Sequence, residues 1–409
     1  MEILHVTATL DGASGVATFV RELNASLRAK GCDTTVITSS CVLPPAATAS
    51  RYNSPTSPLS RVPWLDRNSP SDGGSQLPDI LHIHGLWLKM YHQAAQWAME
   101  SGIPIVWSTH GMTAPWSMHH KWWKKLPAWW LYQKRDLKQA VAIHCTTEQE
   151  VEWNKSIGLS NCFIVPLGTH LPPLVGVSSL SSRKDETFHS PTPTHNSNSS
   201  PSTATASRYT LLFVGRIYPV KGLVNLIKAW KLVQSQDPNS QNSTIPFSNS
   251  NSKLQLNHNW KLRIVGPDQA GHQAELESLV RELNLVDSVE FPGPKFGREL
   301  ELEYENCSAL VLPSFTENFG ATIVDALAHC KPCIASTFTP WRELQAQGCG
   351  WWVSNNPEPL AAAIKEMMTL DDAARRSVGE KGRRLVEDKY TWDAVADTMI
   401  AKYREVVSG

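Results

Sequence analysis

Several features that would assign this chain to other classes of protein are missing from it. Its 38 Lys and Arg residues balance 38 Asp and Glu residues, so bulk charge gives no reason to expect nucleic-acid binding. No apolar run approaches the length of about 18 residues that a membrane-spanning helix needs. The eight cysteines are scattered, and the lone pair Cys330-x-x-Cys333 lacks the second pair of a structural zinc site. We therefore expect buried thiols and a reducing compartment.

The fingerprint of nicotinamide enzymes is also missing. Residues 2–6 predict a first strand and residues 16–30 a helix, but the loop between them has the spacing Gly12-x-x-Gly15 instead of G-x-G-x-x-G. Gly15 would still let a ligand approach the start of the helix closely. No positively charged stretch precedes the first strand, so we expect no signal peptide and a cytoplasmic protein.

Strands and helices alternate in both halves of the 409-residue chain. This pattern predicts the α/β class, with two doubly wound Rossmann-like domains that face a cleft. Stretches 41–78 and 235–258 are poor in periodicity and predict insertions, and 174–207 is dense in Ser, Thr, Pro and Asn. The predicted division is an amino-terminal domain 1–173, a low-complexity linker 174–207, a carboxyl-terminal domain 208–390 and a final segment 391–409.

The most informative stretch runs from Pro313 to Asp325. The apolar residues 309–312 before it predict a buried strand, and residues 321–329 predict a helix. A turn between a strand and a helix start gathers backbone N–H groups and the positive end of the helix dipole. Glu317 near that start and Asp325, about two turns into the helix, could face one cleft. The stretch suits a polyhydroxylated, anionic ligand, and the alternative is an ordinary turn with a capping acid.

A second stretch supplies positive charge. The strand 211–215 ends in glycine and is followed at once by Arg216, with Lys221 one short loop further on. An Arg and a Lys at the carboxyl end of a strand, beside a helix start, are typical of phosphate binding in an open α/β sheet. The alternative is a solvated surface pair.

Histidines mark the ends of two predicted strands in the amino-terminal half. The strand 105–108 is followed by Thr109, His110 and Gly111, and a side chain at that end of a parallel strand points to the cleft. Histidine is also the side chain that titrates near neutral pH. From the residues alone, a functional His110 and a packed, hydrogen-bonded core histidine both stay open. For His82 and His84 we favour packing in the core, with His84 kept as a secondary candidate on the acceptor side.

Residues 112–138 are unusually rich in tryptophan and positive charge. The tryptophans are Trp116, Trp122, Trp123, Trp129 and Trp130, and they are interleaved with Lys121, Lys124, Lys125, Lys134, Arg135 and Lys138. Three interpretations stay open. The segment could lie at a membrane interface, its aromatic rings could stack on sugars, with Trp116 as an acceptor-side candidate, or it could be a core helix with Trp inside and Lys outside.

The two motif stretches together resemble the retaining glycosyltransferases of family 4, which have the GT-B fold. The matching residues are Gly215-Arg216, Lys221-Gly222, Pro313-Ser314, Glu317-Asn318-Phe319-Gly320 and the second acid, Asp325. The family usually has Glu at that second acidic position, so Asp325 is one methylene shorter. The resemblance covers most of the chain and is densest in motifs from about residue 208 to 345.

This resemblance implies transfer of a sugar from a nucleotide-sugar donor to a hydroxyl acceptor, with retention. Arg216 and Lys221 would stabilise the leaving diphosphate, Glu317 would hold sugar hydroxyls, Asp325 the ribose diol, and His110 would orient the sugar or pass a proton. The implied catalytic residues are Glu317, His110, Arg216 and Lys221. The implied donor site is Gly15, Arg216, Lys221, Gly293, Glu317, Asn318, Phe319, Gly320 and Asp325, and the acceptor side has His84 and Trp116.

The resemblance also suggests partners and rivals. No D-x-D motif occurs, so we expect no metal and no cofactor. No residue for a covalent double displacement is evident, so front-face attack is the expected mechanism. A glycan or lipid-linked acceptor, in exopolysaccharide or lipid-linked glycan synthesis, follows from the breadth of the family, with membrane contact through 112–138. The alternatives are a sugar-nucleotide epimerase of the same fold and a non-catalytic nucleotide-sugar-binding module. A final helix would cross back onto the amino-terminal domain.

Overall fold

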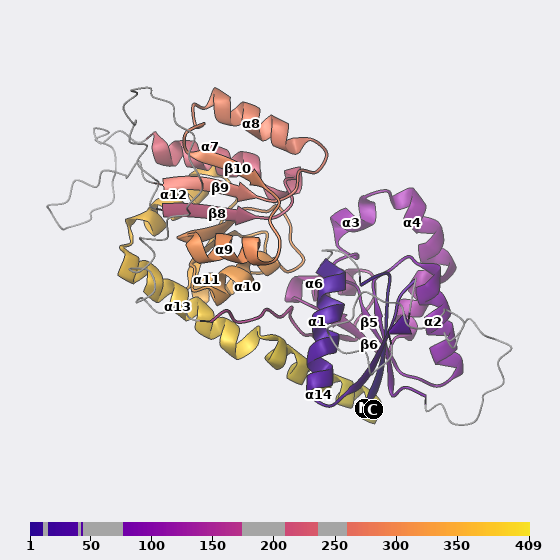
Figure 1. Ribbon diagram of the computed structural model, residues 1–409. Coiled ribbons are helices and arrows are strands. Elements are labelled where there is room, and N and C mark those ends of the chain that lie inside the picture. The colour runs from indigo at the N-terminus through magenta and orange to yellow at the C-terminus, as the bar shows by residue number, and fades with distance from the viewer. Residues whose placement is uncertain (11–14, 40–41, 44–76, 174–208, 236–259) are drawn as a thin grey trace, which may run out of the picture.

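A computed structural model describes residues 1–10, 15–39, 42–43, 77–173, 209–235 and 260–409 (Figure 1). The interior of the predicted insertions and the whole predicted linker lie outside these residues. The described residues form two α/β domains, each with its own sheet. The predicted fold class, two doubly wound domains, is confirmed.

The amino-terminal sheet has the strand order β3-β2-β1-β4-β5-β6-β7. Its neighbours are parallel, except that β3, at the start of the stretch predicted as an insertion, pairs antiparallel with β2. The strands are β1 (Glu2–Thr7), β2 (Asp33–Ile37), β3 (Val42–Leu43), β4 (Ile80–His84), β5 (Ile105–Ser108), β6 (Ala142–Cys145) and β7 (Cys162–Ile164). The helices that flank them include α1 (Gly15–Ala29), α2 (Lys89–Glu100) and α6 (Glu148–Ser156).

The carboxyl-terminal sheet has the order β10-β9-β8-β11-β12-β13 and is parallel throughout. Its strands are β8 (Tyr209–Val214), β9 (Trp260–Val265), β10 (Val289–Gly293), β11 (Ala309–Leu312), β12 (Cys333–Ser336) and β13 (Gly350–Val353). The helices are α7 (Leu223–Gln234), α8 (His272–Glu282), α9 (Arg298–Asn306), α10 (Ala321–Ala328), α11 (Glu343–Ala346), α12 (Pro357–Thr369), α13 (Asp372–Lys389) and α14 (Trp392–Ser408).

Each sheet contains one topological switch point. In the first sheet β1 lies between β2 and β4, and in the second sheet β8 lies between β9 and β11. The chain reaches β4 and β11 by crossing to the other side of the first strand of the domain. Chain order therefore reverses between β1 and β4 and between β8 and β11. Ligands of open α/β sheets bind beyond the carboxyl ends of the strands at such points.

The chain passes between the domains a second time at its carboxyl end. Figure 1 shows α14 running from the carboxyl-terminal domain to the amino-terminal one, where it lies beside α1. Trp392, Met399 and Tyr403 of α14 are buried with Phe19 in one apolar cluster. The end of the amino-terminal domain lies next to the segment that leads into α14, because Thr169 forms a parallel bridge with Thr391. The last helix therefore completes the core of the first domain.

The tryptophan-rich segment folds as α3 (Pro115–His119), α4 (Trp122–Ala128), a π-helix (Trp129–Gln133) and α5 (Lys134–Gln139). Four of its five tryptophans are exposed: Trp116 (55%), Trp122 (54%), Trp123 (59%) and Trp130 (69%). The interpretation as a core helix with its tryptophans inside is therefore wrong, because the apolar rings face outward. Among the described residues, no helix is both long and apolar enough to cross a membrane.

Candidate active site

Lys221 and Glu317, predicted from separate motifs, meet at the switch point of the carboxyl-terminal domain. The Lys221 ammonium lies 2.5 Å from Glu317 Oε1, and Ser314 Oγ donates to the same oxygen at 2.6 Å. Both charged side chains are largely buried, with 14% and 13% of their surface exposed. The pair is thus partly shielded from water, which strengthens its attraction.

Glycine brings these two loops together. Lys221 ends the short 3-10 turn Pro219–Lys221, and Gly222 caps it with φ of 70°. A Cβ atom at Gly222 would lie 2.1 Å from the carbonyl oxygen of Pro313, so no other residue fits there. The backbone N–H of Phe315 also donates to the carbonyl of Val220 at 2.8 Å. The lysine loop and the glutamate loop are therefore locked against each other.

The remaining donor-site candidates of the carboxyl-terminal domain make contacts of their own. Arg216 is exposed and donates to Gln269 Oε1 at 3.0 Å. Gly320 has φ of 84° and precedes α10, and Phe319 is held because Trp341 Nε1 donates to its carbonyl at 2.5 Å. Gly293 ends β10 with φ of 79° and open space around it.

Asp325 has a different partner from the one that its predicted role implies. Its carboxylate accepts a hydrogen bond at 2.7 Å from Thr169 Oγ1, on the first segment that joins the domains. Burial raises the pKa of Asp325 to about 6, and the hydrogen bond from Thr169 opposes that rise. In this structure the second acid thus anchors the connection between the domains.

The loop that carries Glu317 also contacts the amino-terminal domain. Asn318 Nδ2 donates to Thr146 Oγ1 at 3.1 Å, and Thr147 Oγ1 donates to the carbonyl of Asn318 at 3.2 Å. A Cβ atom at Gly111 would lie 2.8 Å from the side chain of Asn318. The motif of one domain is therefore seated on the loops that follow β5 and β6 of the other.

A buried carboxylate that sequence reasoning missed holds those loops. Glu150 has no exposed surface. Its Oε1 accepts from Thr109 Oγ1 at 2.8 Å and from the N–H of Gly111 at 2.5 Å, and its Oε2 accepts from the N–H and hydroxyl of Thr146 at 2.8 and 2.9 Å. The spacing Thr147-x-x-Glu150 is typical of a helix start capped by threonine. That local pattern does not indicate that the Glu150 side chain also holds the loops after β5 and β6.

His110 lies between these held residues and is half-buried. Its φ of 49° is unusual for a residue other than glycine, and its ring stands edge-on to Phe19 at 5.3 Å between centroids. Burial lowers the pKa of His110 to about 3. The imidazole is therefore neutral near pH 7, which favours orienting a ligand over accepting a proton.

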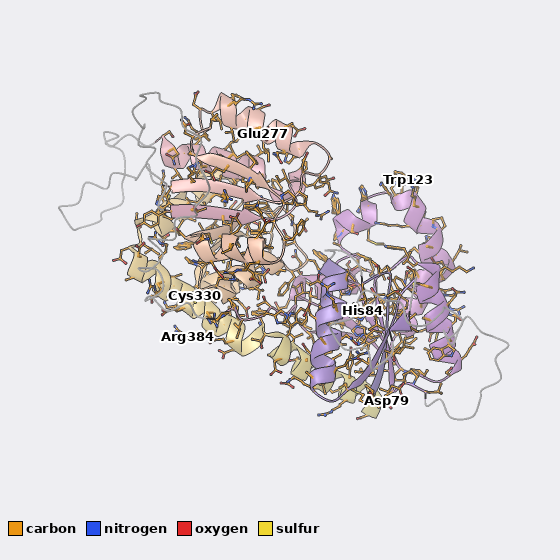
Figure 2. The ribbon with its side chains drawn as sticks, in the orientation of Figure 1. Asp79, His84, Trp123, Glu277, Cys330 and Arg384 are labelled. Carbon is orange, nitrogen blue, oxygen red and sulfur yellow. The ribbon has the colours of Figure 1, made fainter. Side chains whose placement is uncertain are left out.

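The two acceptor-side candidates lie in very different places. Figure 2 shows His84 inside the amino-terminal domain, and it has no exposed surface. Its imidazole therefore cannot touch an acceptor in this conformation, which corrects the secondary role expected for it. Trp116 is exposed on α3, with its ring stacked on His120 at 5.3 Å.

Gly15, the donor-site candidate of the amino-terminal domain, is the first residue of α1 and has open space around it.

Two α/β domains with largely parallel sheets and facing switch points have the architecture of the GT-B fold. Sucrose-phosphate synthase from Thermosynechococcus elongatus is similar over 100% of this chain and 99% of its own, with a TM-score of 0.66 and 19% identity. HepE from Anabaena, described in complex with UDP, is similar over 99% of this chain and 100% of its own, with a TM-score of 0.67 and 14% identity.

Sequence similarity narrows this fold to a family. The model described as Glycosyl transferases group 1 matches residues 197–385, and that described as Glycosyltransferase Family 4 matches residues 13–171. The chain belongs to this family of glycosyltransferases. A D-inositol 3-phosphate glycosyltransferase of Kineococcus radiotolerans is 30% identical over 48% of this chain and 44% of its own length, and one of Geodermatophilus obscurus is 27% identical over 47% and 39%. The chain thus matches less than half the length of these curated relatives.

The seating of Asn318 on Gly111 leads to a first prediction. Replacing Gly111 by Ala should displace the Asn318 loop and lower kcat/KM about tenfold or more, since small misplacements of site groups are costly. Gly158→Ala is the matched control, because Gly158 also has a positive φ, 87°, but open space around it. Both variants should lose about 1–2 kcal/mol of stability from the left-handed backbone. Equal activity of the two variants, measured with the donor, would contradict the seating.

Proposed function

We propose that this protein transfers a sugar, with retention, from a nucleotide-sugar donor to a hydroxyl acceptor. The observation that carries the proposal is the Lys221–Glu317 pair, held at a switch point and facing loops of the other domain. The description of HepE as a complex with UDP-glucose and the names of the relatives support a donor of this class. UDP-glucose is therefore the first donor to test.

The cations act on the leaving group. As the glycosidic bond breaks, negative charge builds on the diphosphate, and Lys221 would leave Glu317 to neutralise it, joined by the exposed Arg216. Backbone N–H groups near Gly320 and Gly15, each at the start of a helix, add fixed positive dipoles. Preorganised groups of this kind, which stabilise charge as it develops, commonly account for more of an enzyme's rate enhancement than any other effect.

The other residues hold the donor. Glu317, freed from Lys221, would accept hydrogen bonds from sugar hydroxyls, and neutral His110 would orient the sugar from the opposite domain. Asp325 would bind the ribose diol after parting from Thr169, and Gly293 would border the base. Asn318 and Phe319 hold the loop in place. Front-face attack by the acceptor, without a metal, is the mechanism that the family resemblance implies.

Donor hydrolysis tests this proposal. With a panel of nucleotide sugars, the wild type should slowly release one nucleoside diphosphate, and Glu317→Ala and Arg216→Ala should each lose about 10²- to 10³-fold in rate, the usual cost of removing a charge-stabilising group. Arg298→Ala, which removes an exposed arginine that pairs with Glu301 and Glu305 on α9, should keep the wild-type rate. EDTA should have no effect.

Other outcomes would point elsewhere. Unchanged rates in both site variants would contradict the proposed site, and loss of activity in EDTA would contradict catalysis without a metal. Donor binding without turnover, even with added acceptors, would favour the non-catalytic binding module. Conversion of the donor sugar without transfer to an acceptor would favour the epimerase.

We also propose that the tryptophan-rich segment docks on an anionic membrane, which fits a lipid-linked acceptor. Its exposed apolar side chains are Trp116, Trp122, Trp123, Leu126, Trp130 and Leu131, and Lys121, Lys124, Arg135 and Lys138 are exposed among them. Figure 2 shows Trp123 at the outer edge of the amino-terminal domain. Tryptophan prefers the membrane–water interface, and each nearby lysine or arginine adds attraction to anionic lipid.

Vesicle flotation tests this docking. The wild type should float with vesicles that contain anionic lipid at low salt, and salt should weaken binding because it screens the charges. The double variant Trp123→Ser/Trp130→Ser should bind about tenfold more weakly or worse, since apolar burial drives interfacial insertion. Phe338→Ser, which removes a ring that is 49% exposed in the other domain, is the control. No flotation of the wild type, or equal flotation of both variants, would overturn the docking.

A further inference from the structure

Three histidines form a chain of hydrogen bonds from the core to the candidate active site. His5 on β1 lies beside His84 on β4, with 2.9 Å between His5 Nδ1 and His84 Nε2. His84 Nδ1 then lies 3.2 Å from His110 Nε2. His5 and His84 have no exposed surface, and His110 is half-buried. The chain therefore ends at the one histidine of the three that a ligand can reach.

All three imidazoles are neutral at physiological pH. Burial lowers the pKa of His5 and of His110 to about 3 and lowers the pKa of His84 well below its usual value. A neutral imidazole has one N–H donor and one bare nitrogen. Each bond of the chain needs one of each, so the orientation of one ring dictates that of the next. Only two tautomer sequences are then compatible with both bonds.

His5, at the buried end of the three-histidine hydrogen-bond chain, decides which of the two tautomer sequences is present. Within the described part of the chain, His5 Nε2 has no hydrogen-bond partner and no contact with solvent. A buried N–H group without an acceptor is rarer in proteins than an acceptor without a donor, so the hydrogen of His5 lies on Nδ1. His5 then donates to His84 Nε2, and His84 must carry its own hydrogen on Nδ1 and donate to His110 Nε2. His110 is left with its hydrogen on Nδ1.

We propose that His84 and His5 are positioning residues that hold His110 in the tautomer with the hydrogen on Nδ1. His110 can then donate a hydrogen bond from a neutral N–H group to the bound nucleotide sugar. The identity of that ligand rests on the proposed function. Orientation of a functional histidine through its second nitrogen is a common device in protein sites. His5 and His84 thus determine both the tautomer and the orientation of the His110 ring.

A metal site is the other use for such a cluster, and the contacts disfavour it. The ligand atoms of His5, His82 and His84 lie within 4.8 Å of one another. However, both nitrogens of His82 are already engaged, Nδ1 with the Tyr403 hydroxyl at 2.5 Å and Nε2 with Ser108 Oγ at 2.7 Å. His5 and His84 are bonded to each other. A metal ion bound to His82 would have to break at least one of its two hydrogen bonds inside a packed core.

Nitrogen-15 NMR of the ligand-free protein, labelled at histidine, tests the proposal directly, because the two ring nitrogens differ in shift between tautomers. His110→Gln assigns the His110 signals. The wild type should show His110 with its hydrogen on Nδ1, and His5→Phe should shift its signals toward a mixture of tautomers. His5→Asn keeps an amide at the position of Nδ1 and should restore the wild-type pattern. The other tautomer in the wild type, or no change in His5→Phe, would overturn the proposal.

Further variants separate positioning from packing. His84→Asn places its amide where Nδ1 was and should keep the tautomer of His110, whereas His84→Gln places it at Nε2 and should lose it. His144→Phe is the control, since His144 is an equally buried histidine that takes no part in the three-histidine hydrogen-bond chain. It forms hydrogen bonds with Ser108 and with the carbonyl of Val165. It should leave the His110 signals unchanged. If His5→Phe fails to fold, the His84 pair decides alone, and equal tautomers in both would overturn the proposal.

Kinetics supply a second measure. His5→Phe and His84→Gln should lower kcat/KM roughly three- to tenfold, the scale of one misplaced hydrogen bond, while His5→Asn and His144→Phe should stay near the wild type. The NMR measurement needs no substrate. Absence of any turnover in the wild type would therefore contradict the proposed function and leave the tautomer result standing, whereas wild-type kinetics in His5→Phe would contradict the positioning role.

Discussion

The buried carboxylate of Glu150 is the constraint on which the rest of the site depends. Burying a charge is costly unless hydrogen bonds replace its hydration, and Glu150 receives them from two hydroxyls and two backbone N–H groups. These donors belong to the loops after β5 and β6. The hydroxyl of Thr146 donates to Glu150 and accepts from Asn318 of the other domain. One residue thereby fixes the loop of His110 and the surface on which the Glu317 loop rests.

Two charged contacts of the carboxyl-terminal domain complete the candidate site. Lys221 and Glu317 form an ion pair with each other, so neither is an unpaired charge in a partly buried place. Asp325 is satisfied by Thr169 at the crossing between the domains. A donor that carries both phosphate and hydroxyl groups could replace these partners one for one. The site thus already has the charges that the proposed ligand needs.

Much of the fold could be predicted from the sequence because its cause is local. Alternating apolar strands and amphipathic helices predicted both domains, and the buried strand 309–312 was predicted with the bounds of β11. The resemblance placed Lys221 and Glu317 in one donor site, and each follows a strand of the same parallel sheet, but their direct ion pair was not predicted.

The features that were missed depend on partners far apart in the chain. Asp325 finds Thr169 at a separation of 156 residues, and no local pattern announces that bond. Glu150 was missed because its carboxylate accepts hydrogen bonds from Thr109 and Gly111, which lie 41 and 39 residues earlier in the chain. The tryptophans of 112–138 were open to three interpretations, since periodicity alone does not say whether a ring meets a core, a ligand or solvent.

A crystal structure with the hydrolysis-resistant analogue of the accepted donor would test the central claim, that one ligand replaces both charged contacts, Lys221–Glu317 and Asp325–Thr169. We predict the diphosphate against Lys221 and Arg216, the sugar hydroxyls on Glu317 with the Lys221 contact opened, and the ribose on Asp325 with Thr169 released. A donor bound elsewhere, with the Lys221–Glu317 and Asp325–Thr169 contacts intact, would contradict the account.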